Sequence, residues 1–204
     1  MALRPYRLGR RRAAAEETRA RIVAAARELL TAGSGVTGFT GDAVARRAGV
    51  ARMTVYYQFG NKLRLVEAVF DSLAVRSGAG ELVAAIQHPE PRQGLTDFIA
   101  AFARFYAADR PIIRRLRGLA ALDPDVEVVW RERAERRREG LRALLERLAA
   151  RHGRPSPQGL DVVVDVLYTL TSFETFDTLA GDTRSVEEIA PLVQRLAQAA
   201  LSLD

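Results

Sequence analysis

The chain has 204 residues, of which 48% are hydrophobic and 27% are charged, and its formal net charge is +6. A chain of this length buries most of its unfolded surface without cross-links. It has no cysteine, which excludes disulfides, thiolate metal sites and cysteine nucleophiles. It also has no uncharged apolar run long enough to span a membrane and no signal-peptide core behind its basic N-terminus, so we expect a cytoplasmic protein.

Apolar residues recur at helical spacing along nearly the whole chain, and no segment alternates as a strand does. With capping residues and prolines at the expected starts, the pattern predicts about nine helices and an all-α fold. The helices are expected over residues 16–30, 40–48, 51–58, 61–75, 96–108, 124–151, 157–179 and 185–202, and one more helix is expected to begin near residue 111. We expect a three-helix N-terminal domain, residues 1–62, joined to a larger helical bundle, residues 63–204.

The most informative segment is residues 39–65, FTGDAVARRAGVARMTVYYQFGNKLRL, which predicts two short helices around a tight turn. Thr40 is placed to cap the first helix by accepting a hydrogen bond from a backbone N–H. Gly49 tolerates the left-handed backbone that ends a helix, and Val50 supplies the apolar contact that closes the turn. These features predict a helix-turn-helix, which places its second helix in the major groove of DNA.

The second helix of this motif has an inward and an outward side. Val55 and Phe59 are four residues apart and are expected to face inward. Apolar and aromatic side chains on the outward side need a partner surface. The expected outward residues are Arg52, Met53, Thr54, Tyr56 and Tyr57. Arg52 is the best candidate for a specific base contact, because a guanidinium binds the O6 and N7 atoms of guanine together.

Positive charge is concentrated around this motif. Residues 1–62 contain 12 Arg or Lys and 4 Asp or Glu, a balance of +8, whereas residues 63–204 contain 19 and 21, a balance of −2. GC-rich coding explains the excess of arginine over lysine, but such a bias acts on both parts of the chain. The asymmetry therefore indicates a polyanionic partner for the N-terminal part.

The run AGVARMTVYYQFGNKLRL resembles the signature of the tetracycline-repressor-type (TetR) family of regulators. The matching positions are Ala48, Gly49, Val50, Val55, Tyr56, Tyr57, Phe59, Lys62 and Leu65. With its flanking helices the resemblance covers residues 18–70, and the rest of the chain fits in length and helicity. Two positions depart from the family pattern: Ala51 replaces a frequent serine and cannot cap with its side chain, and the carboxylate of Asp42 would repel phosphates.

The resemblance implies DNA contacts for individual residues. It places Arg52, Met53, Thr54 and Tyr56 against base edges or sugars, and Thr40, Tyr57, Gln58 and Lys62 against phosphates. From the residues alone, Tyr56 and Tyr57 are also candidates for core tyrosines, and Lys62 for an ordinary surface lysine. The three arginines at 10–12 either form an arm that reaches a minor groove or belong to a solvated tail.

The last two predicted helices are apolar on more than one side, which indicates burial on more than one side. They are either the centre of a monomeric bundle or, as the resemblance favours, a two-fold interface in which each subunit contributes both helices. A homodimer through these helices would allow two motifs, about one DNA turn apart, to read a palindrome.

By resemblance we also expect a small-molecule effector among the C-terminal helices, and the aromatic and aliphatic residues there favour a hydrophobic or amphipathic compound. The candidate lining residues are Phe98, Phe102, Phe105, Tyr106, Trp130, Tyr168, Phe173 and Phe176. Plain core packing is the alternative for each. No cofactor or metal is expected, because neither histidine has a partner at ligand spacing and the acidic residues at 123, 125 and 127 fit a capped helix start.

Together these observations predict a sequence-specific, DNA-binding transcriptional regulator that binds double-stranded DNA, a repressor released from a palindromic operator by its effector. We do not expect an enzyme, because the sequence shows neither a nucleophile–base pair nor a metal constellation. The alternative is a helical ligand-binding or adaptor protein that keeps the helix-turn-helix without binding an operator.

Overall fold

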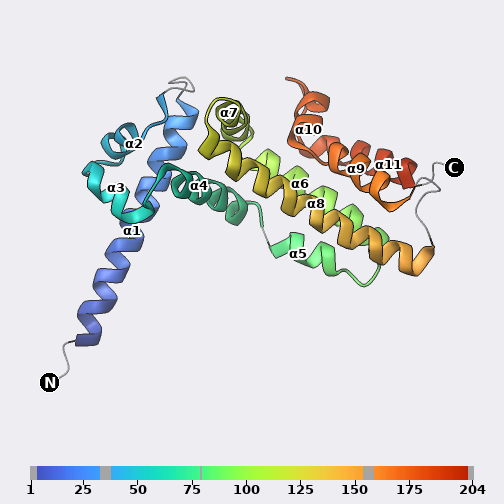
Figure 1. Ribbon diagram of the computed structural model, residues 1–204, viewed down its shortest axis with the longest axis horizontal. Coiled ribbons are helices and arrows are strands. Elements are labelled where there is room, and N and C mark those ends of the chain that lie inside the picture. Colours follow the sequence, from blue (N-terminus) through green and yellow to red (C-terminus); the bar gives the residue numbers. More distant parts are fainter. Residues whose placement is uncertain (1–3, 33–37, 79, 154–158, 202–204) are drawn as a thin grey trace. The chain divides into compact units, whose positions relative to one another are not determined.

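The computed structural model describes residues 4–32, 38–78, 80–153 and 159–201, and these residues form an all-α protein (Figure 1). The described ranges contain eleven α-helices and no strand, so the predicted fold class is confirmed and the predicted number of helices is slightly low. The helices are α1 Arg4–Thr31, α2 Gly41–Ala48, α3 Arg52–Phe59, α4 Lys62–Arg76, α5 Gly80–Gln87, α6 Pro91–Ala108, α7 Arg110–Ala120, α8 Pro124–His152, α9 Leu160–Leu170, α10 Phe173–Ala180 and α11 Ala190–Leu201.

The first helix is longer than predicted, since α1 begins at Arg4 and not near residue 16. The arginines at 10–12 therefore lie within a helix. They are exposed, and Arg12 forms an i,i+4 ion pair with Glu16 at 3.0 Å that supports the helix. Whether these arginines contact DNA stays a prediction.

Two further helix boundaries differ from the prediction. The structure adds α5 between the helices predicted over residues 61–75 and 96–108, and α6 begins at Pro91, before the predicted start at residue 96. The earlier start has a local cause: the side chain of Glu90 accepts a hydrogen bond from the N–H of Arg92, and Pro91 occupies the first helical turn, where its missing N–H costs nothing.

The prediction of a single helix over residues 157–179 is wrong, because the structure has two helices there, α9 and α10, with a turn between them. The hydroxyl of Thr171 donates to the carbonyl of Leu167 at 2.8 Å, and the hydroxyl of Ser172 accepts from the N–H of Thr175 at 3.2 Å. The Ser172 hydroxyl thereby caps the start of a new helix. The side chains of Ser185 and Glu188 each accept a hydrogen bond from the other's backbone N–H, which forms a capping box at the start predicted for the last helix.

The chain divides into two compact units, which we call unit 1 (Met1–Ser72 and Pro111–Trp130) and unit 2 (Leu73–Arg110 and Arg131–Asp204). The predicted functional boundary between residues 62 and 63 stays a prediction. Unit 1 has a core that includes Ile22, Val44, Val66, Val69 and Ile113, all fully buried. Unit 2 has its own core of large side chains, which include Phe98, Leu141, Leu145, Leu167 and Phe176. No described helix is both long and apolar enough to cross a bilayer.

Candidate nucleic-acid interface

The first helix of the motif, α2, is capped as predicted. The hydroxyl of Thr40 accepts a hydrogen bond from the N–H of Ala43 at 3.2 Å, and Asp42 lies in the first turn, where the helix dipole favours a negative charge. Val44, Ala45 and Ala48 are buried, and α2 packs against both α1 and α3. Thr40 therefore caps α2, and its contact with a phosphate stays a prediction.

The turn between α2 and α3 is a Schellman motif centred on Gly49. Gly49 has φ 64° and ψ 37°, a left-handed conformation that glycine adopts without strain. Its N–H donates to the carbonyl of Arg46 at 3.3 Å, and the N–H of Val50 donates to the carbonyl of Ala45 at 3.0 Å. The backbone thus reverses direction within a few residues and brings α3 across α2.

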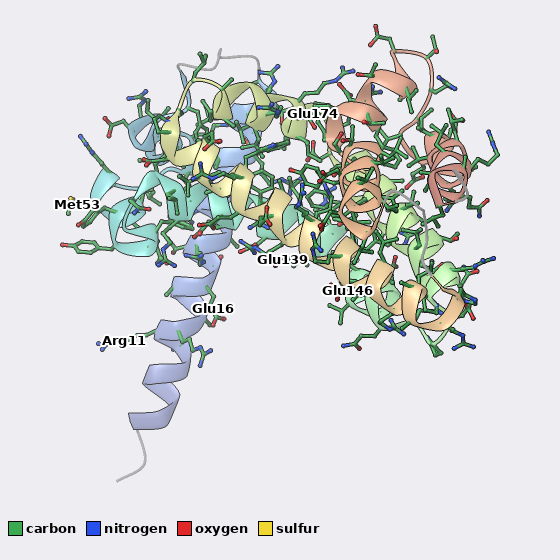
Figure 2. All side chains as sticks on the ribbon, turned by 45° about the vertical axis from the view of Figure 1, so that its right-hand side comes forward. Arg11, Glu16, Met53, Glu139, Glu146 and Glu174 are labelled. Atoms are coloured by element: carbon green, nitrogen blue, oxygen red, sulfur yellow. The ribbon has the colours of Figure 1, made fainter. Side chains whose placement is uncertain are left out.

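The second helix, α3, presents two different faces. Val55 and Phe59 are only 7% and 6% exposed, as predicted, and they anchor the helix in unit 1. Met53, Tyr56 and Tyr57 are 51%, 60% and 79% exposed, so neither tyrosine belongs to the core. Arg52 is also exposed, and Figure 2 shows Met53 projecting outward from α3. Exposed aromatic and apolar groups on a short helix indicate a surface that is covered by a partner.

A contact from α1 fixes the end of α3. Nη1 of Arg19 donates to the carbonyl of Gln58 at 2.9 Å, and its guanidinium lies 4.3 Å from the ring centroid of Phe59. The arginine therefore satisfies a carbonyl at the helix C-terminus and stacks on the anchor residue at once. This role of Arg19 was not predicted, because nothing in the local spacing of α1 shows which side chain reaches a carbonyl 39 residues away.

Arg52, the predicted base-reading residue, begins α3 and is paired with Asp42 on α2. The Arg52 Nε to Asp42 Oδ1 distance is 3.1 Å, and the two side chains are 78% and 48% exposed. An ion pair so accessible to water contributes less than about 1 kcal/mol. The pair therefore orients the guanidinium but holds it only weakly on Asp42. Its predicted neighbours Thr54 and Gln58 are part-buried on the same helix.

Lys62, at the start of α4, is held more firmly. The side chain of Asn61 caps this helix by accepting from the N–H of Arg64 at 2.9 Å. Nζ of Lys62 donates to Oδ2 of Asp123 at 2.5 Å, and the two side chains are only 29% and 22% exposed. Lys62 is thus not an ordinary surface lysine, and any phosphate contact that it makes must compete with this carboxylate.

Asp123 supports the pair from the start of α8. Its Oδ1 accepts hydrogen bonds from the N–H groups of Asp125 and Val126, as the predicted capped helix start requires. Burial raises the pKa of the Asp123 carboxyl, but the hydrogen bond and charge of Lys62, together with the two backbone N–H groups, lower it by more. Asp123 is therefore ionised at neutral pH. The described residues contain no cluster of acidic and histidine side chains fit to hold a metal ion.

One basic residue beside the motif was not predicted. Arg46 and Arg47 are both exposed in the last turn of α2, where cations suit the helix dipole. Arg47 pairs with Glu28 at 2.6 Å, whereas Arg46 has no ion pair with any described residue. A basic residue in the last helical turn before Gly49 was the available signal, and it makes Arg46 a further candidate for a phosphate contact.

Six of the eight residues predicted to line an effector site form a packed aromatic cluster in unit 2. Tyr106 is its centre, with ring centroids of four other predicted residues at 5.4–5.7 Å. These are Phe102, Phe105, Phe173 and Phe176, and Phe98 lies 4.9 Å from Phe102. The other two are Trp130, which belongs to unit 1 and lies 5.9 Å from Phe70, and Tyr168, whose ring lies 4.5 Å from the guanidinium of Arg137.

Unit 2 also contains a cavity of about 410 Å³ between α6, α8 and α11. Its apolar wall includes Leu95, Ile99 and Leu148, and its polar wall includes Gln194 and His152. Gln194 donates to the carbonyl of Thr96 at 3.1 Å, and His152 lies 3.0 Å from Glu90, so both polar groups have partners. None of the eight predicted aromatic residues lines this cavity.

Comparisons with known proteins agree with this geometry. The family model described as "Bacterial regulatory proteins, tetR family" matches residues 22–69. Over 60 residues, the chain is 50% identical to the HTH-type transcriptional regulator SrpR and 48% identical to the uncharacterized HTH-type transcriptional regulator TtgW, both of Pseudomonas putida. These alignments cover 29% of this chain but only 28% and 44% of the two relatives, respectively.

Solved structures extend the likeness to most of the chain. PfmR, a TetR family transcriptional regulator from Thermus thermophilus, aligns with 87% of this chain and 97% of its own, with a TM-score of 0.65 and 20% identity. NalD, the secondary repressor of the MexAB-OprM multidrug efflux pump in Pseudomonas aeruginosa, aligns over 91% and 96% with a TM-score of 0.68 and 21% identity. FadR from Bacillus subtilis, solved with stearoyl-CoA, aligns over 88% and 97% with a TM-score of 0.68 and 14% identity. At these identities the likeness establishes the fold.

Proposed function

We propose that the chain, whose residues 22–69 match the model of the TetR family of bacterial regulatory proteins, is a sequence-specific DNA-binding transcriptional regulator of that family, with α3 as the helix that enters the major groove. The observation that carries the proposal is the division of α3 into a buried anchor, Val55 and Phe59, and an exposed face with Arg52 and two tyrosines. The local excess of positive charge supports a polyanionic partner.

In this proposal the residues of the motif have two kinds of role. Arg52, Met53, Thr54 and Tyr56 contact base edges or sugars, and Arg52 reads guanine with its guanidinium after leaving the weak pair with Asp42. Phosphate contacts come from Thr40, Tyr57, Gln58 and Lys62, to which we add Arg46. Phosphate contacts fix the position of the protein on the duplex, and base contacts supply the sequence preference.

A gel-shift titration tests the proposal. The full-length protein is titrated against DNA from immediately upstream of its own coding region and against a scrambled duplex, over a range of salt. We expect salt-sensitive binding with a preference for the specific duplex. Arg52→Ala should weaken specific binding by about 1–3 kcal/mol, whereas Arg195→Ala, an exposed arginine on α11, should not change it. Equal binding of both duplexes would contradict a sequence-specific regulator and would favour the adaptor alternative.

We further propose that the protein acts as a homodimer through its last helices. Val162 and Val166 on α9 are four residues apart and 41% and 37% exposed, and Leu196 on the neighbouring α11 is 40% exposed. Apolar side chains of this size on adjacent helices suit a two-fold interface. Val166→Arg should produce a monomer in sedimentation analysis, whereas Val83→Arg, which changes an exposed valine on α5, should stay dimeric. A monomeric wild-type protein would contradict this proposal.

The regulator is proposed to be a repressor that a small, hydrophobic or amphipathic effector releases from a palindromic operator. The similar folds of NalD, a repressor, and FadR, which was solved with stearoyl-CoA, support this proposal. An effector shifts the equilibrium only if it binds the form without DNA more tightly than the form on DNA. We propose that the effector binds in unit 2, at the aromatic cluster around Tyr106.

A further inference from the structure

Arg137 on α8 is a positively charged side chain buried inside unit 2. Only 9% of the residue is exposed, and no carboxylate of the described residues forms an ion pair with it. Its neighbours on the same helix behave differently, since Arg138 pairs with Asp165 and Arg142 pairs with Asp161. A buried charge that has lost its hydration is costly unless a counter-charge and hydrogen bonds replace the water.

The hydrogen bonds of Arg137 leave its Nε without a partner. Nη1 donates to the hydroxyl of Tyr106 at 2.9 Å, and Nη2 lies 3.5 Å from the carbonyl of Tyr168, at the long limit for a hydrogen bond. Nε is buried and has no hydrogen-bond partner. Nε and Nη2 together form the fork that binds the two oxygens of a carboxylate in parallel.

Two aromatic rings lie beside the guanidinium of Arg137. The centre of the guanidinium lies 4.5 Å from the ring centroid of Tyr168 and 5.9 Å from that of Phe102. The hydroxyl of Tyr106 donates to the carbonyl of Thr171 at 3.0 Å. Burial raises the pKa of Tyr106 although Arg137 opposes the shift, so this phenol stays neutral and supplies no counter-charge.

We propose that Arg137 anchors an anionic effector, a small carboxylate on an aromatic body, which binds at the Nε–Nη2 edge among Phe102, Tyr106 and Tyr168. Phe102 and Tyr168 are part-buried, so the aromatic cover over Arg137 reaches the surface of unit 2. A planar ligand displaces the Tyr168 ring from the guanidinium and takes over its stacking. The regulatory role of this ligand rests on the proposed function, but its binding to the protein is measured without DNA.

Calorimetric titration of the full-length protein tests the proposal with matched pairs of probes. Benzoate and 2-naphthoate carry the carboxylate, and benzamide and 2-naphthamide have nearly the same shape without the charge. We expect at least one carboxylate to bind with one site per chain and to raise the melting temperature, and its amide to bind about 10- to 100-fold more weakly. Binding of acid and amide with equal affinity, or no binding of either acid, would overturn the proposal.

Substitutions at two adjacent arginines identify the anchor. Arg137→Met keeps the length of the side chain and removes the charge, and it should lose carboxylate binding by the same factor. Arg138→Met is the matched control, because Arg138 also lies over Tyr168, at 5.3 Å, but already has a carboxylate partner. Arg137→Lys retains a cation without the planar fork and should bind the probe with intermediate affinity. It provides the same test if Arg137→Met does not fold.

The outcomes separate this inference from the proposed function. Wild-type carboxylate affinity in Arg137→Met or Arg137→Lys would show that the ligand binds elsewhere and would refute the anchor. A gel shift on the same preparations reports operator binding independently. Operator binding without carboxylate binding would overturn only the inference, whereas carboxylate binding without operator binding would overturn the proposed regulator and leave the anion site in place.

Discussion

Lys62 offers a quantitative test of how the motif balances internal and DNA contacts. Asp123→Asn removes the negative charge that holds Nζ of Lys62 at 2.5 Å. The asparagine oxygen still accepts hydrogen bonds from the N–H groups of Asp125 and Val126, so the cap of α8 is retained. The substitution therefore isolates the effect of the charge on Lys62.

The expected magnitude follows from the exposure of the pair. With side chains 29% and 22% exposed, the pair is less screened than a surface ion pair, and its charge-assisted hydrogen bond is worth about 1–2 kcal/mol. In the proposed DNA complex, Lys62 would lose this energy on turning to a phosphate. Asp123→Asn should therefore lower the free energy of unfolding by about 1 kcal/mol and raise DNA affinity about fivefold per motif.

Fluorescence anisotropy with labelled duplexes at several salt concentrations measures both effects on DNA binding. A freed Lys62 adds one phosphate contact per motif, so the slope of log affinity against log salt should steepen by about 0.9. The increase should be similar for specific and scrambled DNA, because a phosphate contact carries no sequence information. The gain should vanish in a Lys62→Met background. Unchanged affinity and slope in Asp123→Asn would refute the reasoning.

Three further predictions concern folding and titration. Ala51→Ser should raise the free energy of unfolding by about 1 kcal/mol in urea titrations, because Ala51 provides no side-chain cap for α3 and a serine does; an unchanged midpoint would speak against it. Gly49→Ala should lower the free energy of unfolding by about 1–2 kcal/mol, because an alanine at φ 64° is strained. An added Cβ would meet no atom within 4 Å, so backbone strain is the whole effect. A neutral result would contradict the turn geometry. An alkaline absorbance titration should show that the pKa of the Tyr106 phenol is raised above its ordinary value of 10.0, because burial disfavours the phenolate. Because its folded pKa is raised above 10.0, its stabilising contribution is complete below pH 10.0 and is lost as the pH rises through the folded value.

At acid pH, Asp123 makes the free energy of unfolding fall as the pH is lowered, opposite to the effect of Tyr106 at alkaline pH. The pKa of Asp123 is lowered from 3.8 in the folded protein, so the pair with Lys62 stabilises the fold fully above that value. The contribution is lost as the pH falls below 3.8 through the folded pKa. The difference in unfolding free energy between wild type and Asp123→Asn should therefore shrink in acid, and a difference that stayed constant to low pH would contradict the assignment.

Features that depend on residues close in sequence were predictable. The cap at Thr40, the left-handed turn at Gly49 and the anchors Val55 and Phe59 each follow from a few neighbouring residues, and the structure confirms them. The exposure of the tyrosines was one of two readings that the sequence allowed, because helical spacing alone does not decide which face has a partner.

Features that join distant residues were not predictable. The pair of Lys62 with Asp123 spans 61 residues, and the contact of Arg19 with Gln58 spans 39. Arg137 lay in an arginine-rich stretch interleaved with glutamates, where a solvated face was the natural interpretation. Only packing against α6 and α9 residues reveals that this one arginine is buried. The break before α10 was also missed, since it depends on side-chain hydroxyls competing for backbone groups.

The central claim is that outward side chains of α3 read bases, and a specificity profile of Arg52 tests it most directly. An operator is selected from random duplexes with the full-length protein, and the affinities of wild type and Arg52→Ala are measured for every single base-pair change in it. We predict that changing one G·C pair per half-site costs the wild type about 1–3 kcal/mol and costs Arg52→Ala almost nothing. Arg52→Ala retaining the full wild-type profile at every position would contradict the account.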